Sequence, residues 1–259
     1  MTKVHDIIVY LQEMYPLFLA SNFDNGKIGL QFGSHNRSVK KVMIALDGST
    51  EVIEEALEKA VDLLITHHPF MFNSLLNMNY DNPLTKRIKL VIQNELNVFA
   101  MHTNFDVAIG GMNDILLNIL EATPIEEKLE AINDDFLRIG IVNPVTFEEF
   151  INHVKDKFQI THVRAVGNLN KKVKTIGIVG GSGGSELYKA KILGCDVLVT
   201  GEIKHNQALD AKDLGINLIE VSHSIERLFK ETVKDKLSNA FSDVEFILSE
   251  KDYDLFIDK

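Results

Sequence analysis

The sequence contains a single cysteine, no tryptophan and no long apolar run. With Cys195 alone no disulfide can form within the chain, which excludes the disulfide-stapled secreted folds. No apolar stretch approaches the ~18 residues of a membrane-spanning helix. Residues 1–18 carry acidic groups among their apolar residues and lack a small-residue cleavage site, so they are not typical of a signal peptide. These absences favour a soluble cytoplasmic protein with no membrane partner.

Basic residues are also scarce. The chain has 27 Lys and Arg against 37 Asp and Glu, a formal charge of −10, and no dense basic patch. Nucleic acid is therefore not expected as a partner. The 259 residues, 45% hydrophobic and 25% charged, suit a globular protein of one large domain or two ordinary ones.

Apolar patterning predicts strands that alternate with helices, after an amphipathic helix near the amino terminus with Val4, Ile7, Ile8 and Leu11 on one face. Strands are expected over 41–49, 61–69, 96–106, 174–183, 195–205, 216–223 and 243–250. Helices are expected over 50–60, 82–95, 112–122, 147–158, 185–194, 206–215 and 225–237. Alternation of this kind predicts parallel strands joined by right-handed crossovers.

The second half of the chain resembles the first. "VDLLITHH" matches "CDVLVTGE", and "ELNVFAMHTNFD" matches "GINLIEVSHSIE" with Asp106 opposite Glu226. We therefore expect an α/β fold of two similar lobes with mostly parallel sheets, related by pseudo-duplication, with a metal site in the cleft between them. The predicted lobes are 1–123 and 124–259, with the segment from about 223 packing back on the first. Residues 124–172 are expected to add strands to the second lobe.

Polar residues collect where the predicted strands end, which is where parallel α/β sheets bind ligands. They include five of the nine histidines and are Asp47, His67, His68, His102, Asp106, Glu202, His205, His223 and Glu226. Imidazoles with carboxylates and without thiolates suit zinc, manganese, iron or nickel. This number of metal-binding side chains suits two ions better than a single ion that keeps open coordination positions. A hydrogen-bonded polar network at a lobe interface is the alternative.

Two glycine-containing segments carry weaker signals. "VGGSGGSE" at 179–186 could cradle phosphate, although it matches no nucleotide-binding fingerprint and a tight turn explains it nearly as well. "ASNFDNGKIGLQFG" at 20–33, with Asp24, is most simply a turn whose polar groups could face the site.

Taken in order, "DNGKIGLQFG", "ITHHPF", "HTNFD", "GGMND", "GGSGGSE", "TGEIKHNQALDAKDLG" and "SHSIER" resemble the Nif-three-like proteins, often catalogued as GTP cyclohydrolase 1 type 2 homologues. The resemblance implies two similar lobes, a dinuclear centre and commonly a homohexameric ring. The metal ligands it implies are His67, His68, Asp106, His223 and Glu226, with the adjacent histidines serving one ion each. One departure is Ser222, where many members have glycine.

The resemblance implies a metal-dependent hydrolase that acts on a nucleotide or a related small molecule, by opening a cyclic amidine C–N bond as in GTP. Glu202 and His205 would then transfer protons beside the two divalent ions. Support of the ligands by these two residues is an equal alternative. The competing function is a non-catalytic, metal-binding or chaperone-like oligomeric module. The apolar run at 69–80 is expected at a subunit interface of the homo-oligomer, or packed on its own lobe.

Overall fold

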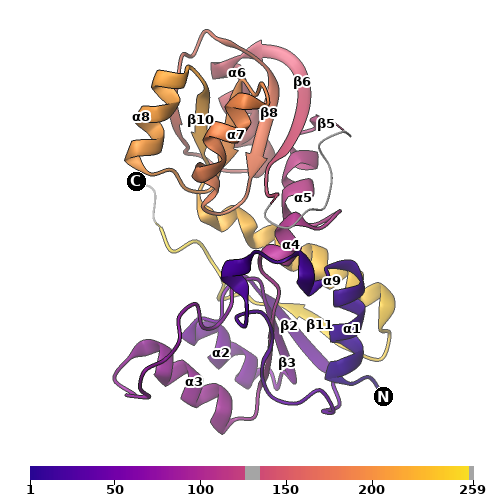
Figure 1. Cartoon of the computed structure of the whole chain (residues 1–259). Coiled ribbons are helices and arrows are strands. Elements are labelled where there is room, and N and C mark those ends of the chain that lie inside the picture. Colours follow the sequence, from indigo (N-terminus) through magenta and orange to yellow (C-terminus); the bar gives the residue numbers. More distant parts are fainter. Residues whose placement is uncertain (126–134, 257–259) are drawn as a thin grey trace. The chain divides into compact units, whose positions relative to one another are not determined.

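The structure, a computed structural model, describes residues 1–125 and 135–256 and divides into two units (Figure 1). Met1–Ala108 and Arg227–Leu255 form the first unit, and Ile109–Glu226 form most of the second. The sequence places the division at 123 and 124, whereas the chain leaves the first unit after Ala108 and returns at Arg227. Residues 126–134 of the segment 124–172 lie outside the described residues.

The first unit contains a five-stranded sheet of order β1-β4-β3-β2-β11. The strands are β1 (Gly29–Phe32), β2 (Lys41–Ala45), β3 (Leu63–Thr66), β4 (Asn97–Ala100) and β11 (Glu245–Leu248). Strands β11, β2, β3 and β4 run parallel, and β1 pairs antiparallel with β4. The turn predicted over 20–33 is wrong for residues 29–32, because these residues pair with β4 as strand β1. The helices are α1 (Val4–Met14), α2 (Thr50–Glu58), α3 (Pro83–Gln93), α4 (Thr103–Val107) and α9 (Leu228–Ala240).

Local chemistry explains where these helices begin. Helix α2 follows Ser49, whose side chain accepts a hydrogen bond from the Val52 amide at 3.2 Å. Helix α3 has Asn82 as its cap and Pro83 in its first turn, where the missing amide of proline costs nothing. Helix α1 buries the four apolar residues expected on its inner face.

The second unit contains a six-stranded sheet of order β5-β6-β8-β9-β10-β7. The strands are β5 (Thr123–Pro124), β6 (Arg138–Thr146), β7 (Arg164–Val166), β8 (Lys172–Val179), β9 (Val197–Thr200) and β10 (Asn217–Glu220). The helices are α5 (Met112–Ile119), α6 (Phe147–Phe158), α7 (Leu187–Ile192) and α8 (His205–Leu214). Strands β8, β9 and β10 are parallel, while β5, β6 and β7 make antiparallel pairs. The chain is thus a mixed α/β protein with two sheets.

Both sheets contain the same four-strand arrangement, because β1-β4-β3-β2 and β7-β10-β9-β8 each have one antiparallel strand beside three parallel ones. The hydrogen bonds correspond as well. Asn97 Oδ1 accepts from the Ser34 amide at 2.9 Å, and Asn217 Oδ1 accepts from the Asn168 amide at 3.2 Å. A Cβ on Gly33 or Gly167 would collide with these asparagines, at 2.0 and 2.1 Å respectively.

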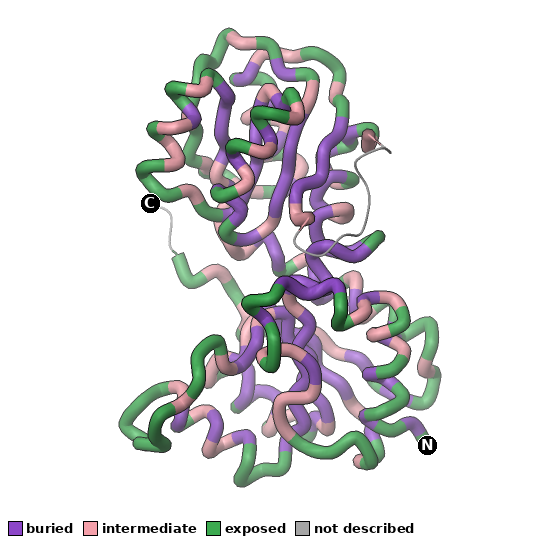
Figure 2. Tube along the Cα trace, in the orientation of Figure 1, coloured by how far each residue is buried: buried purple, intermediate pink, exposed green. Residues whose placement is uncertain are grey.

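The central strands are the most buried parts of each unit (Figure 2). Every residue of β3, β4 and β9 is buried, because helices or loops cover both faces of these strands. The segments that follow the carboxyl ends of such strands return to the surface, so polar side chains there can reach a ligand. Among the described helices, none combines the length and the apolar composition that crossing a bilayer requires.

Candidate metal centre

Two adjacent histidines follow β3 directly. The ladder with β2 continues past the strand, since the His67 amide donates to the Ala45 carbonyl at 3.3 Å and the His68 amide to the Leu46 carbonyl at 3.0 Å. The two rings nevertheless approach each other, with centroids 5.1 Å apart. The backbone therefore turns enough after Thr66 for both imidazoles to lie on one side.

His67 is fully buried between aromatic rings. Its ring centroid lies 5.2 Å from that of Phe229 and 6.1 Å from that of Phe105. Its Nε2 lies 3.5 Å from Oδ1 of Asp106, a buried residue of α4. A carboxylate beside an imidazole in such apolar surroundings is a donor pair that a divalent cation stabilises.

His102, at the start of α4, joins the two histidines. One ring nitrogen from each of His67, His68 and His102 lies within 4.8 Å of the other two. His102 stands at the end of a strand predicted from the sequence, but it is not among the metal ligands that the resemblance implies. Strand β4 stops at Ala100 and α4 starts at Thr103, which is why the predicted strand 96–106 is too long.

Carboxylates hold two of these three imidazoles. His68 Nδ1 lies 2.8 Å from Asp47 Oδ1, and His102 Nδ1 lies 2.9 Å from Asp24 Oδ2. Burial alone raises the pKa of the Asp24 carboxyl, but hydrogen bonds from His102 and Thr103 outweigh it, so this pKa lies below its usual range. Asp24 is therefore a buried carboxylate that stays ionised.

The second unit carries a separate donor pair at the end of β10. His223 Nε2 lies 3.1 Å from Glu226 Oε2, and His223 Nδ1 lies 2.7 Å from Glu202 Oε1. Glu226 is buried, whereas the Glu202 side chain is about half exposed. Glu202 thus contacts the imidazole on the side away from Glu226.

Each glycine of 179–186 is closely packed, and Gly180 and Gly181 lie against this pair. A Cβ on Gly180 would lie 3.2 Å from Glu226 Oε1, and one on Gly183 would lie 2.5 Å from the Val179 side chain. The Gly183 amide donates to Thr200 Oγ1 at 2.9 Å. Close packing accounts for these glycines, so they provide no argument for a phosphate site.

His205 is an exposed residue at the first position of α8. Within the described part of the chain, none of the clusters of three or more close donor atoms includes it. Its role stays a prediction. Sequence reasoning also missed that Asp24 and Asp47 contact imidazoles, because no local pattern shows which loops meet in space.

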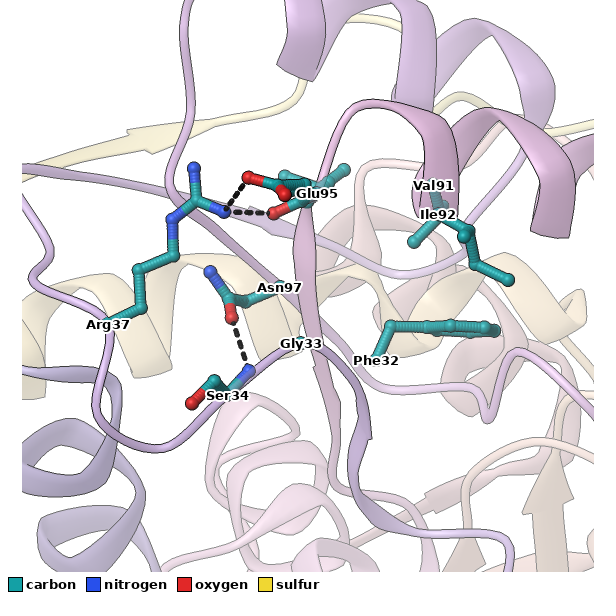
Figure 3. Close-up of a pocket in the computed structure, with 9 residues that line it drawn as sticks. Phe32, Gly33, Ser34, Arg37, Val91, Ile92, Glu95 and Asn97 are labelled. Atoms are coloured by element: carbon teal, nitrogen blue, oxygen red, sulfur yellow. Dashed lines mark hydrogen bonds and ion pairs between the residues drawn. The ribbon is translucent and has the colours of Figure 1, made fainter.

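A hollow of about 350 Å³ lies where β4 begins, at the end of the first sheet opposite to the one that carries the histidines (Figure 3). Figure 3 shows Arg37 directed at Glu95, whose carbonyl accepts its hydrogen bond at 2.5 Å, and Asn97 directed at Ser34. Phe32, Val91 and Ile92 supply apolar walls. Since its polar groups bind one another, this hollow offers less chemistry than the histidine cluster.

Comparison with known proteins agrees with the resemblance in the sequence. A protein of Clostridium perfringens named GTP cyclohydrolase 1 type 2 homolog is 35% identical over 263 residues, covering 98% of each chain. A Bacillus cereus protein related to NIF3 has a TM-score of 0.89 at 26% identity, covering 100% of this chain and 99% of that one. A hypothetical protein of Staphylococcus aureus gives 0.88 at 32% identity and 99% coverage of both. The family model Duf34/NIF3 (NGG1p interacting factor 3) matches residues 2–254, and the chain therefore belongs to this family.

Proposed function

We propose that the chain binds two divalent metal ions through His67, His68 and Asp106 of the first unit and His223 and Glu226 of the second. The observation that carries this proposal is the convergence of His67 and His68 beside a third imidazole and the buried Asp106. Each unit supplies too few donors to complete two ions alone.

Covalent connectivity supports a shared centre. The Phe229 ring contacts the His67 ring within the first unit, at 5.2 Å. Glu226 precedes Phe229 by three residues, and three residues span at most ~11 Å. The other crossing, after Ala108, follows Asp106 by two residues. Each of the two points at which the chain passes from one unit to the other therefore lies within two residues of a proposed ligand.

The donor chemistry fits such ions. Imidazole nitrogens with carboxylate oxygens suit zinc, iron, manganese or nickel. The single thiol, Cys195, is buried in an apolar cluster of the second unit rather than among the proposed ligands. Within each unit a carboxylate contacts the Nδ1 of a proposed ligand, Asp47 for His68 and Glu202 for His223. Such contacts orient ligating imidazoles.

We further infer that the two units arose by duplication. The Asp62 carboxylate accepts from the amides of Lys40 and Lys41, and the Asp196 carboxylate accepts from those of Lys174 and Thr175. Together with the matched asparagines, these contacts support a common origin. By the same register Asp106 corresponds to Glu226, so these two proposed ligands occupy equivalent positions.

The activity that we propose is hydrolysis of a C–N bond in a cyclic amidine of a nucleotide or related small molecule. When bound, two divalent ions activate water and stabilise developing negative charge. Glu202, half exposed and in contact with His223, and His205 are the residues proposed to transfer protons. The name of the Clostridium perfringens relative supports the nucleotide class.

Self-association is part of the proposal, with a homohexamer as the expected form. The run 69–80 is divided between two environments. Phe70 is buried in the core of the first unit, and Met71 and Leu75 pack against that core. Phe72, Leu76 and Met78 are exposed, and Leu76 is 96% accessible. An exposed group of this kind supports an interface between copies.

Metal analysis of purified protein tests the site. Wild type should hold two ions per chain, and His67→Ala, Asp106→Ala and His223→Ala should each hold fewer, while the exposed His35→Ala should match wild type. Unchanged stoichiometry in all three ligand variants would overturn the assignment.

A screen of nucleotides with metal-loaded protein tests the activity. Turnover that His68→Ala abolishes supports the hydrolase. His205→Ala should keep both ions and lose roughly 10²–10⁴-fold in rate. Metal-loaded wild type without turnover on any cyclic amidine would favour the non-catalytic module instead.

A further inference from the structure

Asp24 holds the imidazole of His102 in one orientation. Asp24 is fully buried in the short helix η2 (Asn22–Asp24). Its two carboxylate oxygens lie 2.9 and 3.0 Å from His102 Nδ1. It also accepts from the Thr103 amide at 3.2 Å and from the Thr103 hydroxyl at 2.5 Å. A buried carboxylate with this many donors is fixed in place, so it fixes the ring that donates to it.

This contact selects the tautomer of His102. An ionised carboxylate accepts but cannot donate, so Nδ1 carries a proton and Nε2 is the ring nitrogen through which a metal can bind. Because Asp24 occupies Nδ1, Nε2 is the nitrogen left to join the group formed with His67 and His68. His102 thus offers an imidazole nitrogen that can bind a divalent metal ion.

Aromatic packing restricts the same ring further. The centroids of Phe23 and Phe72 lie 6.0 and 5.6 Å from that of His102, both edge to face, and the His67 centroid lies 5.3 Å away. The His102 side chain is only 14% exposed. The ring is therefore held against rotation on several sides.

His102 shares its arrangement with two of the proposed ligands. His68 with Asp47 and His223 with Glu202 make the same Nδ1–carboxylate contact, at 2.8 and 2.7 Å. Carboxylates positioned in this way commonly orient histidines that bind metals. A histidine kept only for packing needs neither a buried ionised partner nor two neighbouring imidazoles.

We propose that His102 is a sixth protein ligand of the metal centre, binding through Nε2, and that Asp24 is its positioning residue. This inference rests on the proposed metal site. It adds a nitrogen donor from the first unit beside His67 and His68, and it gives the segment around Asp24 a function beyond that of a turn.

Metal titration of the whole chain tests the proposal, with Zn²⁺ for affinity and Co²⁺ for its visible absorption. The variants are His102→Ala, His102→Gln and Asp24→Asn, with His35→Ala as the exposed histidine control in the same unit. Circular dichroism of the metal-free proteins reports folding. Glutamine can still donate to Asp24, so His102→Gln keeps the test informative if the alanine variant does not fold.

Asp24→Asn should weaken Zn²⁺ binding by roughly 10–100-fold. His102→Ala and His102→Gln should weaken it at least as much and change the Co²⁺ spectrum, which a purely structural residue would leave unaltered. A folded His102 variant with wild-type Zn²⁺ affinity and Co²⁺ spectrum would overturn the proposal. Absence of Zn²⁺ binding by wild type would instead overturn the metal site on which it rests.

Discussion

Oε1 of Glu226 lies 2.5 Å from the point that a Cβ atom would occupy on Gly181, and His223 Nε2 lies 3.3 Å from the same point. Gly181→Ala should therefore push the Glu226 carboxylate away from His223 and weaken metal binding. A loss of at least about 10-fold in Zn²⁺ affinity is expected, comparable to the loss of an orienting contact. Isothermal titration measures this change.

Gly194→Ala is the matched control. Gly194 has a φ of +80° and Gly181 a φ of +51°, so both substitutions place a side chain in the left-handed region. No atom lies within 4 Å of a Cβ on Gly194. The control should lose stability without losing metal affinity. If the two variants bind Zn²⁺ equally well, the displacement of Glu226 by the new side chain is excluded.

Ser222 holds a left-handed backbone conformation next to a proposed ligand, with a φ of +82°. This conformation costs a residue with a Cβ roughly 1–2 kcal/mol, whereas glycine adopts it freely. Ser222→Gly should therefore be about 1 kcal/mol more stable than Ser222→Ala after the extra entropy of the unfolded chain is counted, since both variants lose the contacts of the Ser222 hydroxyl with Ser224. Thermal unfolding with a chelator present measures this, with Ser222→Ala as the comparison because alanine keeps the Cβ. A glycine variant no more stable than the alanine variant would exclude the explanation.

Glu55 should make the stability of the first unit pH-dependent. Burial alone raises the pKa of this carboxyl, but hydrogen bonds from Lys59, Ser249 and the backbone after Ser249 lower it from 4.5 to about 2. A group with a lowered folded pKa stabilises above its unfolded pKa, and this stabilisation is lost as the pH falls from about 4.5 to about 2.

Glu55→Gln removes this ionisation. At pH 7 it should cost up to about 3 kcal/mol, the value of a shift of this size. Urea unfolding at pH 7, 4 and 3 measures the free energy of unfolding of wild type and of Glu55→Gln. The difference between the two free energies should become smaller as the pH falls. A gap that stays constant with pH would contradict the assignment.

Light scattering tests self-association. Wild type should give a mass above the 29.1 kDa of one chain. Leu76→Glu should shift the mass toward the monomer, because it charges the exposed part of the run 69–80. Ile192→Glu on α7 is the control, since Ile192 is also highly exposed, at 83%. A wild-type mass of 29.1 kDa would rule out the assembly.

Elements with strong local signals were predictable from the sequence. Helix α6 has the predicted bounds, since Thr146 and Glu149 form a capping box and the buried residues that follow have helical spacing. Strand β1 was missed because its four residues show no alternating burial pattern and depend on pairing with β4. The end of β4 was misplaced because the Thr103 amide at the start of α4 is bound by Asp24, which lies far away in the sequence.

The candidate site was predictable to the same extent. The rule that ligands gather beyond parallel strands predicted His67, His68 and His223 as candidate site residues, since each follows a clear apolar strand. The same rule listed Asp47 and Glu202, but it did not show which imidazole each contacts, and it left out Asp24. Asp24 and Asp47 contact histidines 78 and 21 residues away, and such meetings between loops depend on the folded chain.

The order of the units along the chain affects how the protein is synthesised. Most of the second unit is one continuous segment, Ile109–Glu226, and this segment is finished once Glu226 has left the ribosome. Strand β2 of the first unit pairs with β3 on one side, but its second parallel neighbour, β11, is made about two hundred residues later. Until then β2 exposes a row of backbone groups to which other strands can bind. The unit that is begun first is therefore finished last, and the newly made chain is most vulnerable to aggregation during that interval.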